Sequence, residues 1–135
     1  MSLNAIKKLF LVAALYDIIM GIVFAVLFKP VYEAFGAALP NNDGYIQLLA
    51  LLIFTFGVGF YLIYRNPLQN RQFAILGILM KLSFVLVVFG HLFFDAIPIP
   101  QIYIPLATID LLFVPFFAVS YSRLKKLAVS ETKRA

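Results

Sequence analysis

Residues 73–94 read FAILGILMKLSFVLVVFGHLFF, an apolar run in which Lys81 is the only residue that carries a full charge at neutral pH. A run of about 20 apolar residues can cross the roughly 30 Å hydrocarbon core of a bilayer as an α-helix. A lysine in the middle of such a helix is costly, and it is kept where it meets a partner or serves a function. This stretch therefore predicts a membrane-spanning helix with a charged site inside it.

Three other runs have the same character, so the sequence predicts four spans, at about residues 9–28, 45–64, 73–94 and 102–121. Proline, asparagine and glycine gather between the runs, as in Pro40-Asn41-Asn42-Asp43-Gly44 and Asn66-Pro67. The chain is 64% hydrophobic and 13% charged, whereas a soluble domain has about 25% charged residues. Almost all of the 135 residues belong to the spans and their short connections, which predicts a single membrane domain.

The basic residues lie mainly on one side of the predicted spans. Nine of the eleven are on that side: Lys7, Lys8, Arg65, Arg71, Arg123, Lys125, Lys126, Lys133 and Arg134. The positive-inside rule places this side in the cytoplasm. We therefore expect an all-α integral membrane protein of the cytoplasmic (inner) membrane, an up-and-down four-helix bundle with both termini cytoplasmic. Residues 127–135 are expected to form a polar tail, and residues 31–35 a short interfacial turn.

Two further charges, Asp17 and Asp110, lie inside predicted spans. At 1.5 Å per residue, Asp17 and Lys81 each lie about 12 Å from the cytoplasmic ends of their helices, and Asp110 about 17 Å from that side. All three therefore fall near the midplane of the core. Small residues share their helix faces (Ala13, Ala14, Gly21, Gly77 and Ala107), which is typical of surfaces where membrane helices pack closely. We expect both carboxylates to lie within reach of Lys81.

This charged cluster has two interpretations. Two carboxylates beside one ammonium leave one negative charge uncompensated, so the acids are expected to share a proton and to titrate as a coupled group. On this view the cluster binds or relays a small ligand, a proton or a cation. On the other view it is a buried ion pair that fixes the register of the helices.

Four other residues are secondary candidates. His91 precedes Asp95 by one helical turn and could pass protons to the deeper cluster, or it could simply be hydrated at the interface. Tyr61 could supply a hydroxyl group to a cavity, or belong to the interfacial aromatic belt. Pro115 cannot donate a hydrogen bond to the Leu111 carbonyl, which predicts either a broken helix beside Asp110 or a static kink.

Several function classes are disfavoured. There is no cysteine, and there is no phosphate-binding loop, nucleophile elbow or metal-ligand motif, so we expect no metal and no cofactor. Catalysis on a lipid or quinone is the least favoured reading. The net charge of +5 follows from membrane topology rather than from nucleic-acid binding. The expected partners are the lipid bilayer and, because so small a bundle has little interior volume, a second copy or a larger membrane complex.

The order of motifs resembles that of small bacterial four-helix proteins of the DoxX-like kind. The matching segments are Leu27-Phe28-Lys29-Pro30, Phe35-Gly36, Phe56-Gly57-Val58-Gly59-Phe60-Tyr61-Leu62, Arg65-Asn66-Pro67-Leu68-Gln69-Asn70-Arg71 and Gly77-x-x-x-Lys81. The resemblance implies association with membrane redox or stress systems, although the absence of cysteine argues against disulfide exchange. Small multidrug exporters are also similar, with four helices and an acidic residue in the first. This chain lacks their tryptophan and adds Lys81.

We therefore expect a small membrane protein whose midplane cluster binds or relays a ligand, proton or cation. The alternative is a non-catalytic accessory or assembly subunit of a larger membrane complex, in which the cluster is structural.

Overall fold

The computed structural model describes residues 1–94 and 99–132, and within them the chain is helical with short connections. The helices are α1 (Leu3–Val26), α2 (Phe28–Ala34), α3 (Asp43–Arg65), α4 (Phe73–Phe94) and α5 (Tyr103–Thr132). Four of the five, all except α2, are long and apolar enough to cross a membrane. The prediction of an all-α chain with four such helices is confirmed.

Local sequence explains where the helices begin and end. The side chains of Ser2 and Asn42 cap α1 and α3 by accepting hydrogen bonds from the backbone N–H groups of Ala5 and Gly44. Pro30 has no N–H to donate to the Val26 carbonyl, which favours a break in the helix before it. The chain ends α1 at Val26 and begins the short helix α2 instead, where a turn was expected at residues 31–35.

The last helix is longer than the span predicted from the sequence. That prediction ended the fourth span at residue 121 and assigned residues 127–135 to a polar tail. α5 continues to Thr132. The segment from Leu124 to Ala128 consists of leucine, lysine and alanine, which favour a helix, and no glycine or proline interrupts it. Residues 133–135 of the expected tail lie outside the described residues.

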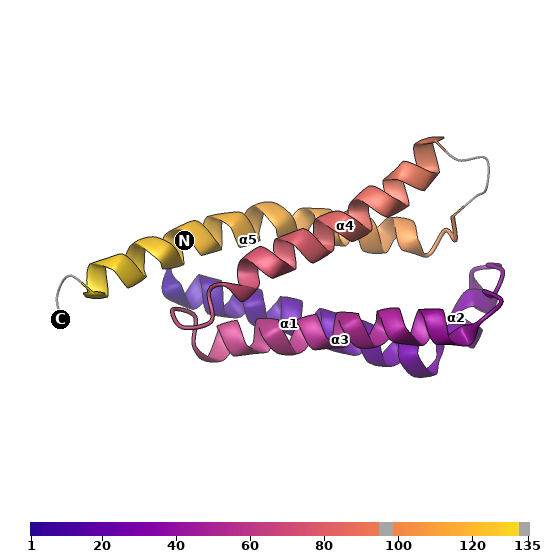
Figure 1. The fold of residues 1–135 in the computed structure, drawn as a ribbon, viewed down its shortest axis with the longest axis horizontal. Coiled ribbons are helices and arrows are strands. Elements are labelled where there is room, and N and C mark those ends of the chain that lie inside the picture. The colour runs from indigo at the N-terminus through magenta and orange to yellow at the C-terminus, as the bar shows by residue number, and fades with distance from the viewer. Residues whose placement is uncertain (95–98, 133–135) are drawn as a thin grey trace.

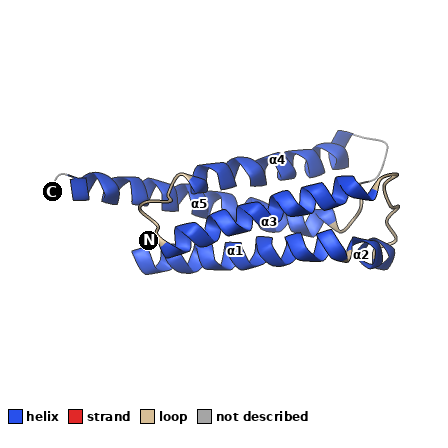
Figure 2. Cartoon of the chain, turned by 60° about the horizontal axis from the view of Figure 1, so that its bottom comes forward, coloured by secondary structure: helices blue, strands red, loops and turns tan. Residues whose placement is uncertain are grey.

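The long helices form two pairs (Figure 1). α1 packs along α3, and α4 packs along α5, while α3 and α4 approach one another much less. In Figure 1, α4 leans away from α1 and α3 toward its C-terminal end. Figure 2 shows the four long helices as one elongated bundle, with α2 at one end and the C-terminal part of α5 extending beyond the other. The two pairs therefore meet over part of their length only.

Glycines allow the close approach of α1 and α3. A Cβ atom on Gly57 would lie 2.8 Å from the Ile18 backbone nitrogen and 3.1 Å from the Ala14 carbonyl oxygen. On the opposite helix, a Cβ on Gly21 would lie 2.9 Å from the Ala50 carbonyl oxygen. Both positions face backbone atoms of the neighbouring helix, which cannot rotate away. Small residues allow membrane helices this contact, in agreement with the expected packing role of Gly21.

The core is divided into regions on either side of the middle of the bundle. One cluster, which includes Phe10, Phe60 and Phe117, lies toward the N-terminal part of α1, and another, which includes Phe24 and Tyr32, lies toward α2. The hydroxyl groups of Tyr32 and Tyr103 are hydrogen bonded, and this contact ties α2 to the start of α5. Between these regions lie the three buried charges.

We predict that Gly57→Ala destabilises the fold, because its new methyl group would press on the α1 backbone. Overpacking of this kind typically costs about 1–3 kcal/mol. Gly90→Ala is the matched control, since a Cβ there would have no atom within 4 Å. Thermal unfolding in detergent should show a lower midpoint for Gly57→Ala and no loss for Gly90→Ala. Equal midpoints for the two variants would contradict the close α1–α3 contact.

Candidate functional site

The structure brings Asp17, Lys81 and Asp110 together from α1, α4 and α5. The Lys81 ammonium nitrogen lies 3.1 Å from Asp17 Oδ1 and 2.6 Å from Asp110 Oδ1. All three residues are buried, with exposed fractions of 1% for Asp17, 0% for Lys81 and 6% for Asp110. The prediction that both carboxylates lie within reach of Lys81 is confirmed, and the arrangement is hereafter called the ion triad.

Aromatic rings surround the ammonium group on its remaining sides. Lys81 Nζ lies 5.4 Å from the ring centre of Tyr16, 5.8 Å from that of Phe60 and 5.1 Å from that of Phe113. A cation at this distance from a ring is attracted by the electron density of the ring face. Phe60 brings α3 into contact with the site, so all four long helices contribute to the environment of the lysine.

A tightly packed aromatic layer supports the ion triad on the side of the N-terminus. The ring centres of Phe10 and Phe117 are 4.7 Å apart, and those of Phe60 and Phe117 are 5.0 Å apart. Gly77 makes room for this layer, because a Cβ there would lie 3.1 Å from Phe117 Cε2 and closer still to the Phe60 ring. Gly77 is one turn before Lys81 on α4. The aromatic layer that packs against Gly77 therefore also positions the helix backbone near Lys81.

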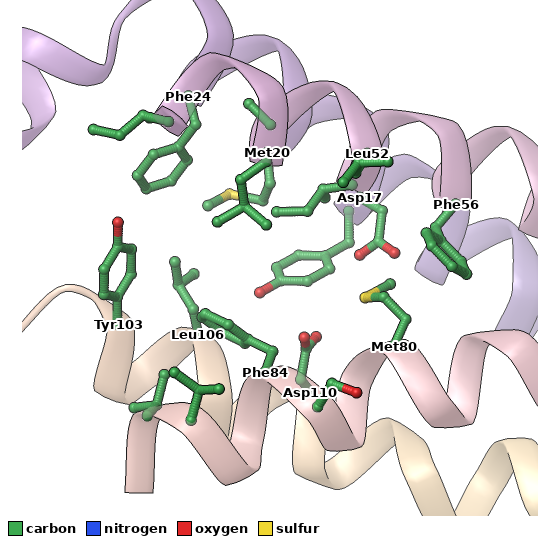
Figure 3. A pocket seen from close by; sticks show the side chains of 18 of the residues that line it. Asp17, Met20, Phe24, Leu52, Phe56, Met80, Phe84, Tyr103, Leu106 and Asp110 are labelled. Atoms are coloured by element: carbon green, nitrogen blue, oxygen red, sulfur yellow. The ribbon is translucent and has the colours of Figure 1, made fainter. Parts of the chain in front are cut away.

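On the other side of the ion triad lies a cavity of about 610 Å³. Asp17 and Asp110 line it, and in Figure 3 their carboxyl groups point toward one another. Most of its other lining is apolar and includes aromatic and methionine side chains: Tyr16, Met20, Phe24, Phe56, Met80, Phe84 and Tyr103. The cavity is therefore mainly apolar, with the two carboxylates close together in its wall.

The cavity opens on the outer surface between α3 and α4. Its exposed lining residues all belong to these two helices: Leu49 and Leu52 on α3, and Leu76, Leu79, Ser83 and Val87 on α4. In a membrane-spanning bundle, such a surface faces the acyl chains. The opening follows from the separation of α3 and α4 and gives a route from lipid to the ion triad.

Lys81 is not among the residues that line the cavity. It approaches the two carboxylates from the packed side, so the cavity presents acidic groups rather than the ammonium. Lys81 binds Asp110 through Oδ1, and within the described residues the other carboxylate oxygen of Asp110 has no hydrogen-bond partner. Asp110 is thus the member of the ion triad that is most available to a ligand.

Three of the secondary candidates, His91, Tyr61 and Pro115, do not line the cavity. His91 is exposed in the last turn of α4 and does not line the cavity, and Asp95 lies outside the described residues. Tyr61 is 39% exposed and accepts a hydrogen bond from the Arg65 guanidinium group, away from the cavity. The expectation that Tyr61 supplies a hydroxyl group to a cavity does not fit this position.

Pro115 does not break its helix. α5 runs from Tyr103 to Thr132 with Pro115 inside it, so the interpretation of a broken helix beside Asp110 is wrong. Pro115 and Leu111, whose carbonyl group loses its usual partner, are both exposed. Both residues therefore lie on the outer face of α5, and neither lines the cavity.

Sequence reasoning missed most of the cavity wall. The aromatic residues around the ammonium include Tyr16, adjacent to Asp17, and Phe113, three residues after Asp110. The spacing of three residues places Phe113 on the same helix face as Asp110, and this signal could have identified it. Tyr16 gave no such signal, because adjacent residues of a helix do not face each other. Met80 and Phe84 of α4 gave no comparable signal, because apolar residues of a membrane helix face lipid as often as they face a cavity.

Comparisons with known proteins found no matching family model, curated protein or solved structure. The resemblance to DoxX-like proteins therefore stays a prediction, and the functional argument rests on the geometry of the ion triad and the cavity.

We predict that Lys81→Met strongly destabilises the protein, because it leaves two carboxylates buried without a counter-charge. Removing one partner of a buried pair typically costs about 3–5 kcal/mol. The triple variant Asp17→Asn, Lys81→Met, Asp110→Asn should recover much of this loss, since it buries no charge. Unfolding midpoints in detergent provide the measurement.

The exposed pair Lys29–Asp43, with an N–O distance of 2.7 Å, is the control. Lys29→Met removes the same chemistry at the surface, where a pair contributes about 0–1 kcal/mol. A Lys81→Met variant no less stable than Lys29→Met would show that the buried charges are not coupled as described.

Proposed function

We propose that this chain is a multi-pass protein of the cytoplasmic membrane that binds or relays a small cation, a proton or a small ligand at the ion triad. The observation that carries the proposal is the position of Asp17 and Asp110 in the wall of the cavity, where both are paired with Lys81, which does not line it. A triad that served packing alone would need no chamber beside its acidic groups.

The charge of the ion triad favours a cationic ligand. With both carboxylates ionised, the site carries a net charge of −1, which is costly in a low-dielectric interior. A proton on one carboxylate or a bound cation removes this excess. The aromatic side chains in the cavity wall, among them Phe56 and Phe84, would favour a cationic group that carries apolar substituents.

The distribution of basic residues supports the orientation with both termini in the cytoplasm. The N-terminus, the connection between α3 and α4, and the C-terminal part of α5 lie toward one end of the molecule (Figure 1). Basic residues gather there, including Lys8, Arg71 and Lys125, whereas Lys29, Glu33 and Asp43 lie near α2. The positive-inside rule places the basic end in the cytoplasm.

A second candidate function is that of an accessory or assembly subunit, either within a larger complex or in a homo-oligomer. One observation favours it: among the described residues, every fully buried side-chain nitrogen and oxygen atom has a hydrogen-bond partner, so Lys81 is satisfied without a ligand. On this proposal the opening between α3 and α4 would receive a helix of the partner.

Proton binding distinguishes the two candidates. In lipid nanodiscs, we expect the infrared band of protonated carboxyl groups to change reversibly with bulk pH, and Asp17→Asn with Asp110→Asn to alter that change in a way that the control does not. The control is Glu33→Gln with Asp43→Asn, which removes two acids outside the cavity. Benzylammonium, a small hydrophobic cation, should reduce the protonated band at constant pH because it competes with the proton.

The assembly role gives a different result. A sealed structural triad would show no reversible change in the band that depends on Asp17 and Asp110, and benzylammonium would have no effect. Either finding, in protein that keeps its helical circular dichroism spectrum, would reject the binding proposal.

The orientation can be tested by labelling, because the chain has no cysteine of its own. Ala38→Cys lies between α2 and α3, and Ser130→Cys lies near the end of α5; both positions are exposed. A membrane-impermeant maleimide should label Ala38→Cys in intact spheroplasts and Ser130→Cys only after the membrane is opened. The reverse pattern would place the termini outside the cytoplasm.

A further inference from the structure

A second hollow lies on the outer face of α5, remote from the ion triad. It has a volume of about 360 Å³ and is lined by Met1 and by five residues of α5: Ala118, Val119, Ser122, Arg123 and Lys126. Below, these six residues are called the α5 groove. Nothing in the proposed function uses this groove, so it requires an explanation of its own.

The helical spacing separates the α5 groove into an apolar part and a polar part. Ala118 and Val119 lie one turn before Ser122 and Arg123, and Lys126 lies one turn after them. The distance from Val119 to Lys126 along the helix axis is about 10 Å. A single ligand of modest length can therefore touch both parts at once.

The position along α5 matches the boundary between acyl chains and headgroups. A helix that enters the hydrocarbon core near Tyr103 leaves it after about 20 residues, close to Ser122. Ala118 and Val119 then lie at the depth of the acyl chains, while Arg123 and Lys126 lie at the depth of the headgroups. The polarity of the groove changes at the depth where the polarity of a phospholipid changes.

The polar groups of the groove have unused hydrogen-bonding capacity. Within the described residues, Arg123 and Lys126 form no ion pair, and the hydroxyl group of Ser122 makes no hydrogen bond. Ser120 and Ser130 differ, since each donates its hydroxyl proton to a carbonyl group of its own helix. Three donors thus converge on one place, and two of them are cationic.

We propose that the α5 groove binds one anionic phospholipid. Its phosphate accepts hydrogen bonds from Ser122, Arg123 and Lys126, and the first part of an acyl chain lies along Ala118 and Val119. Arginine suits this role because its planar guanidinium group can donate two hydrogen bonds to one phosphate. A zwitterionic lipid fits less well, because its own cation would lie beside Arg123 and Lys126.

Purified full-length protein in a neutral detergent, titrated with phosphatidylglycerol or phosphatidylcholine and examined by native mass spectrometry, tests the proposal. We expect one phosphatidylglycerol to be retained in preference to phosphatidylcholine. Arg123→Gln with Lys126→Gln should weaken phosphatidylglycerol binding at least about tenfold, since one charge-assisted hydrogen bond has that effect or more. Lys125→Gln is the matched control, because Lys125 is equally exposed and adjacent but does not line the groove.

Two results would overturn the proposal. Equal losses in Lys125→Gln and in either single variant, Arg123→Gln or Lys126→Gln, would show general attraction between a basic surface and acidic lipid rather than a site. Glycerol phosphate that displaces phosphatidylglycerol at equal concentration would show a site for a free phosphate group. Val119→Ser keeps every charge and should weaken phosphatidylglycerol binding without changing glycerol phosphate binding; an unchanged lipid affinity would remove the acyl contact from the proposal.

Discussion

The structure depends on how Lys81 is compensated. An ammonium group inside a membrane helix is costly unless opposite charges and hydrogen bonds replace the water that it loses. Asp17 from α1 and Asp110 from α5 supply these contacts, and both lie on helices other than α4, which carries Lys81. The requirement to pair one charge therefore links three helices, and through Phe60 the fourth.

This link has a geometric consequence for the rest of the bundle. α1 and α3 pack closely through Gly21 and Gly57, and α4 packs against α5. The two pairs share one core cluster around Phe10, Phe60 and Phe117 and a second one near α2, where Phe24 meets Tyr103. Beyond the ion triad, α4 leans away and the space between the pairs becomes the cavity. The ion triad thus lies where a dry aromatic layer meets an open chamber. That position explains why the lysine faces packed rings while the acids face the cavity.

Much of the fold could be predicted from the sequence because lipid imposes simple rules. Apolar runs of sufficient length gave the four long helices, and 73–94 was predicted to the residue. The depths of Asp17, Lys81 and Asp110 followed from the fixed rise of a helix, and their proximity followed from the cost of leaving a charge unpaired. The extension of α5 to Thr132 was missed because the span length says where the bilayer ends and not where the helix ends. Of the two interpretations of Pro115, the broken helix was wrong, because a proline in a long helix removes one hydrogen bond without necessarily ending the helix.

The sequence by itself determined which residues had to meet, since hydrophobic length and buried charge act on each helix separately and leave few permitted arrangements. Only the tertiary structure decided which of these side chains face the cavity and which are covered by packing. The tilt of α4 away from α3, the placement of Lys81 behind the carboxylates and the wall of Met80 and Phe84 depend on how side chains of different helices interlock. In an apolar helix, every face looks alike in sequence, because lipid and protein interior accept the same residues. The cavity therefore depends on how the helices pack, whereas the contacts of the ion triad follow from the need to pair buried charges.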